Sequence, residues 1–90
     1  MNKQQLIKAI AQDAGITQTA AAKALNAFQN QVVAALQDGE DVTLVNFGTF
    51  KAVPRAEREG RNPKTGEPLM IPAATVPRFV AGKGLRDAVN

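Results

Sequence analysis

All five prolines of this 90-residue sequence fall between positions 54 and 77. Proline has no backbone N–H, so a β-sheet tolerates it only on an edge strand or at an irregularity. The same stretch holds few residues that could fill a core, and the run Asn62-Pro63-Lys64-Thr65-Gly66 near its middle is typical of a turn. Residues 54–75 are therefore predicted to form a protruding two-stranded β-arm. Because such a ribbon is barely stable alone, we expect it to be mobile without a ligand.

The residues before the arm predict a helical hairpin over 1–39. Asn2 and Gln5 have the spacing of a capping box, and the first helix is expected to end at Gly15. Thr17 can cap a second, longer helix that stops near Gly39. Apolar residues recur in this second helix at three- and four-residue spacing, namely at Ala21, Leu25, Phe28, Val32 and Leu36.

A two-residue alternation then replaces the helical period, which predicts a sheet body from residues 40–53 and 76–82. Gly82 breaks the last strand, and residues 83–90 can form a short C-terminal helix. The expected fold class is α+β, with a helical hairpin, a three-stranded antiparallel sheet that carries the arm, and the short helix. We expect residues 1–90 to form a single domain.

A chain of this length buries only about 60 to 65% of its unfolded surface, so its own core is marginal. The sequence has no Cys for a disulfide, which leaves oligomerisation as the means of stabilisation. Ordinary core packing is the simplest interpretation of the four phenylalanines. A domain this small leaves one apolar face open. If a second copy covers this face, the same residues form both the core and the dimer interface. The candidate interface residues are Phe28, Val32, Leu36, Leu44, Phe47, Phe50 and Phe79.

The charge is divided unequally along the chain. Residues 1–50 carry three lysines against four acidic residues, whereas residues 51–90 carry eight basic residues against four acidic ones. All five arginines lie in this second part. The planar guanidinium suits phosphates and base edges, so this asymmetry favours a nucleic-acid partner over an ordinary solvated surface.

The missing residue types argue against catalysis. The chain has no Ser, His or Cys, and no two carboxylates share an apolar context that would shift a pKa, so we expect no enzyme, cofactor or metal site. The Gly-Lys pair at Gly82 and Lys83 lacks the flanking residues of a phosphate loop. No apolar run has the length of a signal sequence or a membrane span, so we expect a cytoplasmic protein with no membrane partner.

The arm contains the residues that point to DNA. Arginines and a lysine on a thin ribbon can enter a DNA groove, where minor-groove proteins also insert an apolar wedge that kinks the duplex. Pro63 is the wedge candidate, and a plain turn residue is the alternative interpretation. The basic residues of the arm are Arg55, Arg58, Arg61 and Lys64.

Strict strand alternation conflicts with a uniformly basic arm. It places Arg55 and Arg61 on one face together with Glu57 and Glu59, and Arg58 on the other face. A bulge or strong twist around Glu59 and the following glycine would reunite the arginines.

Three motifs, NFGTF, GRNPKTG and VPRFVAGKGLRDAVN, resemble those of the bacterial HU histone-like proteins, and the resemblance covers the whole chain. It implies an intertwined homodimer, or a heterodimer with a paralogue, that binds double-stranded DNA through the minor groove with little sequence specificity. It also implies that the protein bends and compacts DNA in the nucleoid, with the proline of each arm tip intercalated.

Residue by residue, the resemblance implies that Pro63 is the tip proline, preceded by Arg61 and Asn62, and that Arg55 and Arg58 are arm arginines. Phe47, Phe50 and Phe79 match interface aromatics, and Lys3, Lys83 and Arg86 match basic residues on the body of the dimer. The family often has a basic residue at position 80, which is Val80 here, while an arginine stands at Arg78. The candidate DNA-binding residues are Lys3, Arg55, Arg58, Arg61, Asn62, Pro63, Lys64, Arg78, Lys83 and Arg86.

The arm's three glutamates, Glu57, Glu59 and Glu67, predict moderate affinity for plain duplex and a preference for bent, nicked or gapped DNA, which costs less to deform. Two related functions stay open at this point. One is a sequence-preferring bender like integration host factor, whose chains usually extend a few residues further. The other is an RNA-binding protein, since basic arms also contact RNA. A pure protein-interaction module would leave the arm arginines unexplained.

Overall fold

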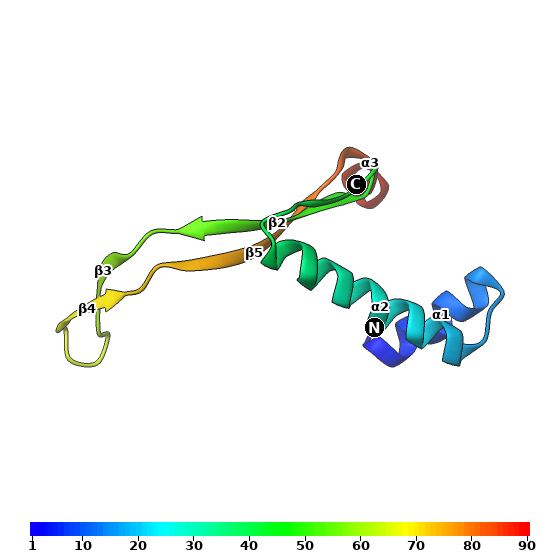
Figure 1. The fold of residues 1–90 in the computed structure, drawn as a ribbon, viewed down its shortest axis with the longest axis horizontal. Helices are drawn as coiled ribbons and strands as arrows, with labels where there is room; N and C mark the ends of the chain where they lie inside the picture. The colour runs from blue at the N-terminus through cyan, green and yellow to red at the C-terminus, as the bar shows by residue number, and fades with distance from the viewer. The chain divides into compact units, whose positions relative to one another are not determined.

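Local hydrogen bonds cap the starts of both helices of the helical hairpin in the computed structural model, which describes residues 1–90 (Figure 1). Helix α1 spans Lys3–Ala14, and Asn2 and Gln5 exchange two hydrogen bonds of 2.9 Å as a capping box. Helix α2 spans Gln18–Gln37, and the Thr17 hydroxyl accepts a hydrogen bond of 3.1 Å from the backbone N–H of Ala20. Gly15 ends α1 in the left-handed conformation. These cap predictions are confirmed.

The chain divides into two compact units, residues 1–34 and residues 35–90. The first unit has a small core in which only Ile7, Ala11 and Ala21 are buried. Ile10, Ala22 and Leu25 pack against these three residues and stay partly accessible. No large side chain anywhere in the chain is fully buried. A single chain therefore has very little hydrophobic core.

The second unit contains a three-stranded antiparallel sheet in the order β1-β2-β5. Its strands are β1 (Val42–Leu44), β2 (Gly48–Arg55) and β5 (Ala74–Ala81). The pairing of β2 with β5 extends to Arg55 and Ala74, two residues beyond each predicted edge of the sheet body. Pro54 and Pro77 lie within these strands. Pro54 belongs to the part of β2 that does not pair with β1, and Pro77 lies on the edge strand β5. Both positions tolerate a missing N–H.

Strands β3 (Arg58–Arg61) and β4 (Pro68–Ile71) form a separate two-stranded ribbon, the predicted arm (Figure 1). Two residues on each side separate it from the β2–β5 pair, and the register is the same before and after this interruption. In that register Pro72 would face Glu57. The ladder is interrupted at this position, where Pro72 has no N–H to donate.

The suggested bulge around Glu59 is not present. Glu59 pairs with Met70, and Gly60 pairs with Leu69, in regular antiparallel register. The irregularity lies instead at the Pro72 interruption, where the pairing between the two chain segments is absent. Successive side chains of β3 therefore point to alternate faces of the ribbon along its whole length.

Helix α3 (Lys83–Val89) begins where the chain passes close to the β1–β2 turn. The N–H of Gly82 donates to the Phe47 carbonyl at 2.8 Å. A Cβ atom at Gly84 would collide with the carbonyl oxygen of Asn46. The two glycines around Lys83 thus serve close packing of the backbone. None of the three helices is long and apolar enough to cross a membrane.

Candidate nucleic-acid interface

The sheet has one aromatic face and one basic face. Phe50 and Phe79 are cross-strand partners whose ring centroids lie 4.8 Å apart, and the Phe47 ring lies 5.8 Å from that of Phe79. Because side chains alternate along a strand, Lys51 and Arg78 lie on the opposite face. Strand pairing therefore separates the aromatic residues from the cations.

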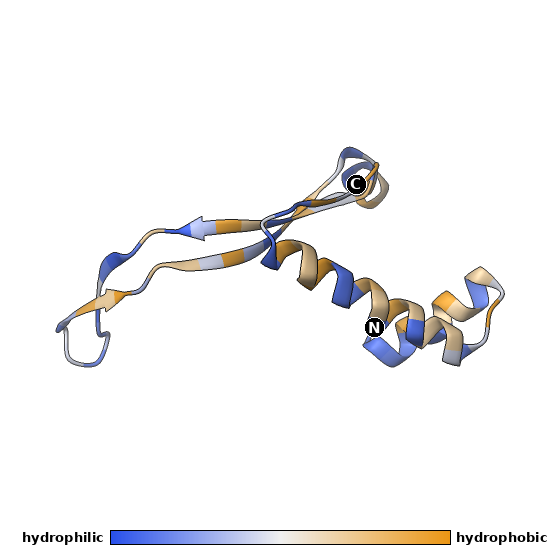
Figure 2. Ribbon diagram, in the orientation of Figure 1, coloured by the Kyte–Doolittle hydropathy of each residue, from blue (hydrophilic) through white to orange (hydrophobic).

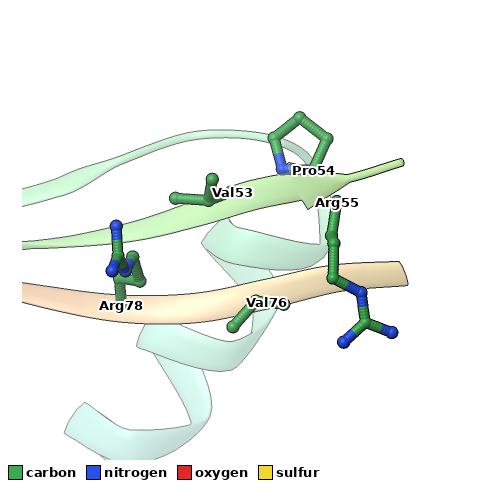
Figure 3. A pocket seen from close by; sticks show the side chains of 5 residues that line it. All are labelled: Val53, Pro54, Arg55, Val76 and Arg78. Atoms are coloured by element: carbon green, nitrogen blue, oxygen red, sulfur yellow. The ribbon is translucent and has the colours of Figure 1, made fainter. Parts of the chain in front are cut away.

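Arg55 is held at the interruption between the sheet and the ribbon. Its Nη2 donates to the Pro72 carbonyl oxygen at 3.1 Å, so the arginine binds a backbone acceptor at the point where the ladder stops. Its Nε is buried and has no hydrogen-bond partner. Figure 3 shows Val53 and Val76 between Arg55 and Arg78 in a hollow of about 280 Å³, which Pro54 also lines.

The ribbon's two faces differ in charge and in polarity. Arg58 shares a face with Gly60, Leu69 and Ile71, whereas Arg61 shares the other with Glu59 and Met70. The Ile71 side chain lies only 3.0 Å from where a Cβ of Gly60 would stand, so this glycine makes room for it. Figure 2 shows apolar colour on β4 and hydrophilic colour on β3. The predicted separation of Arg58 from Arg61 thus holds in the structure.

The loop at the ribbon's tip is organised by Asn62. Its side-chain oxygen accepts from the N–H of Lys64 at 2.9 Å, and its carbonyl accepts from the N–H of Gly66 at 2.7 Å. Its own N–H donates to the Glu67 carbonyl at 2.8 Å. Asn62 therefore shapes the turn, whereas Pro63 and Lys64 are exposed at the tip.

The predicted body contacts lie on different elements. The Lys3 ammonium donates to the Asn26 side-chain oxygen at 2.6 Å, which links α1 to α2 and leaves two of its three donors available. Lys83 and Arg86 are both exposed on α3. Three residues apart, they are neighbours on one side of that helix.

Acidic residues of the second unit avoid the sheet. Strands β1, β2 and β5 contain no Asp or Glu, whereas Glu57, Glu59 and Glu67 lie in or beside the ribbon. The chain has no group of three or more His, Cys, Asp or Glu residues that could hold a metal ion. The strands that form the basic face thus contain no acidic residue, and Asp41, which would stand opposite Lys51 in the continued β1–β2 register, lies just outside β1.

The candidate dimer-interface residues all stay partly or largely accessible in the single chain. Phe28, Phe47 and Phe79 are exposed, with 37, 46 and 43% of their surface accessible. The other four are half-buried, namely Val32, Leu36, Leu44 and Phe50. Their role in an interface stays a prediction.

Lys51 was missed by the sequence analysis. It is the direct cross-strand partner of Arg78, and Val80 lies on the same face two residues further along β5. The basic face therefore survives without a cation at position 80. Only the β2–β5 register places Lys51 there, and no local sequence signal gives that register.

Comparison with known proteins decides the family. A family model described as bacterial DNA-binding protein matches residues 1–90. The DNA-binding protein HU-beta of Neisseria meningitidis serogroup A is 62% identical over 89 residues, which cover 99% of this chain and 100% of that protein. The chain belongs to the HU family of bacterial DNA-binding proteins. The HU-beta protein of Escherichia coli K12 is 54% identical over the full length of both chains.

Solved HU structures have the same fold. The HU chain of an Anabaena HU–DNA cocrystal structure matches with a TM-score of 0.93 and 46% identity, covering 99% of this chain and 97% of that one. HU from Thermotoga maritima matches over the full length of both chains with a TM-score of 0.72 and 28% identity. The α+β class and the HU resemblance predicted from the sequence are confirmed.

Proposed function

We propose that this HU-family protein is an architectural protein of the bacterial nucleoid, in the cytoplasm, that binds double-stranded DNA with little sequence specificity and bends it. The observation that carries the proposal is the β3–β4 ribbon, which is mostly exposed and presents Arg58, Arg61 and Lys64 beside the tip proline. Fold stability gives no reason for cations on a ribbon of this kind. Membership of a DNA-binding family and the fold shared with a DNA-bound HU chain support the same function.

Binding without sequence preference follows from the contacts available. Guanidinium and ammonium groups contact phosphates, which position a protein on DNA without specifying bases. The minor groove, into which the ribbon is proposed to enter, distinguishes little more than A·T from G·C pairs. Asn62 is occupied by the turn, so its proposed contribution is to hold Pro63 at the tip.

The working unit is proposed to be a dimer. The only buried hydrophobic residues of the single chain are Ile7, Ala11 and Ala21, while the aromatic face of the sheet leaves Phe47 and Phe79 exposed. A second copy, or a paralogue with the same apolar positions, would cover these residues and supply the missing core. Residues 1–90 would then form one domain with their partner. The melting temperature is expected to rise with protein concentration.

Titration against three ligands of equal length tests the function. Plain duplex should bind moderately, nicked or gapped duplex more tightly because it bends at lower cost, and A-form RNA more weakly. Tighter binding of the RNA would replace DNA by RNA as the ligand. A strong preference for one DNA sequence would indicate a function like that of integration host factor.

Substitution of Pro63 by alanine separates bending from binding. Intercalation costs a few kcal/mol of unstacking, which a kinked complex recovers through additional contacts. P63A should therefore bend DNA much less, while the ribbon's cations retain most of the affinity. End-to-end fluorescence transfer on a doubly labelled duplex at saturating protein measures the bend. An unchanged bend would show that Pro63 is only a turn residue.

A further inference from the structure

Two cations on the sheet are placed where they repel each other. Lys51 of β2 and Arg78 of β5 are direct cross-strand partners, and both side chains are exposed. Directly opposed residues of an antiparallel pair have Cβ atoms about 5 Å apart, and like charges in such a pair are destabilising. Strands β1, β2 and β5 contain no Asp or Glu, and Asp41, which the continued β1–β2 register would place opposite Lys51, lies just outside β1. No acidic residue of the strands themselves therefore offsets the repulsion between Lys51 and Arg78.

The surroundings of the pair suit a sugar-phosphate backbone. Next along the two strands, Val53 pairs with Val76, and these valines line the hollow of about 280 Å³ together with Arg55 and Arg78 (Figure 3). A DNA strand alternates anionic phosphates with deoxyribose rings that have apolar faces. An apolar floor bordered by guanidinium groups matches that alternation.

We infer that Lys51 and Arg78 together hold one phosphate of bound DNA, outside the contacts made by the ribbon, with the adjoining sugar against Val53 and Val76. The inference rests on the proposed function and adds a phosphate site on the sheet to it. A phosphate between the two cations replaces their repulsion by two charge-assisted contacts. The pair is thus unfavourable in the free protein and favourable in the complex.

Binding measurements on charge-neutral variants test the phosphate site. K51Q, R78Q and the double variant are compared with the wild type and with K23Q, which removes one charge from an exposed position of α2. Affinity for a labelled duplex is measured by fluorescence anisotropy over a range of salt concentrations. Log affinity falls with log salt, and each lost phosphate contact makes this slope shallower by about 0.9. The double variant should therefore make it shallower by about 2 per dimer. K23Q should leave the slope unchanged.

Thermal unfolding without DNA supplies a second readout, in which the variants that lose DNA binding should gain stability. K51Q and R78Q should each melt at a higher temperature than the wild type in low salt, because the repulsion is removed, and K23Q should not. A double variant that binds duplex with the wild-type slope overturns the inference. Lost binding together with a lower melting temperature also overturns it, because the pair would then be structural. Failure of the wild type itself to bind duplex would instead contradict the proposed function.

Discussion

The three-stranded sheet and the β3–β4 ribbon follow one another along the same two chain segments, yet different interactions hold them. β2 and β5 share eight residue pairs, a third strand beside them and an aromatic contact of 4.8 Å. β3 and β4 share four pairs and have no further strand. A ribbon of this kind is marginally stable in water. The sheet is therefore the scaffold, and we propose that DNA completes the ribbon.

The boundary between the two regions has a chemical cause. Pro72 cannot donate a ladder hydrogen bond, and its carbonyl oxygen accepts from Arg55 instead. The sheet thus ends beside a residue that has no N–H to donate, and pairing resumes after two unpaired residues on each segment. The register continues unchanged across this point.

Removing an aromatic ring from the sheet should have the largest effect on stability. Phe79 contacts both Phe47 and Phe50, and F79A should lower the free energy of unfolding by about 3 kcal/mol. Leu69 of the ribbon has a similar exposed fraction, 45% against 43% for Phe79, but L69A should cost less than about 1 kcal/mol. Urea unfolding followed by circular dichroism measures both. Equal losses would contradict the division into scaffold and ribbon.

A methyl group added to one glycine in each region gives a sharper comparison. A Cβ at Gly48 would collide with the Phe79 ring and lie 2.7 Å from the Val80 carbonyl oxygen. G48A should therefore cost about 2 kcal/mol of stability. At Gly60 the neighbour is the flexible end of Ile71, at 3.0 Å, so G60A should cost less than about 1 kcal/mol. Similar melting temperatures for the two variants would show that the sheet is as deformable as the ribbon.

Arg58 tests the ribbon's role in binding with little effect on folding. R58A removes one exposed cation from each arm of a dimer. The slope of log affinity for duplex against log salt should therefore become shallower by up to about 2. Stability should change by less than about 0.5 kcal/mol, as is usual for surface positions. The matched variant R58K keeps the charge and should retain the slope. Lost affinity with an unchanged slope would mean that Arg58 reads a base or supports the fold.

Local signals made the helix ends and the ribbon predictable from the sequence. Asn2, Thr17 and Gly15 act through hydrogen bonds or backbone angles within a few residues, and the prolines limit where strands can pair. The cross-strand register was not predictable, because alternation within one strand does not specify its partner. Consequently the pairing of Lys51 with Arg78 and the position of the interruption came only from the structure.

Hydrogen exchange of backbone amides, with and without duplex DNA, tests most directly the claim that DNA completes the ribbon. The backbone amides of Arg58–Arg61 and of residues 69–71 should exchange rapidly in the free protein, while those of the β2–β5 pair, apart from its two prolines, should be protected. With free duplex at one hundred times its Kd, exchange in the ribbon should slow by about 100-fold, and exchange in the sheet should change far less. A ribbon that is as protected as the sheet without DNA, or unaffected by its addition, would contradict the account.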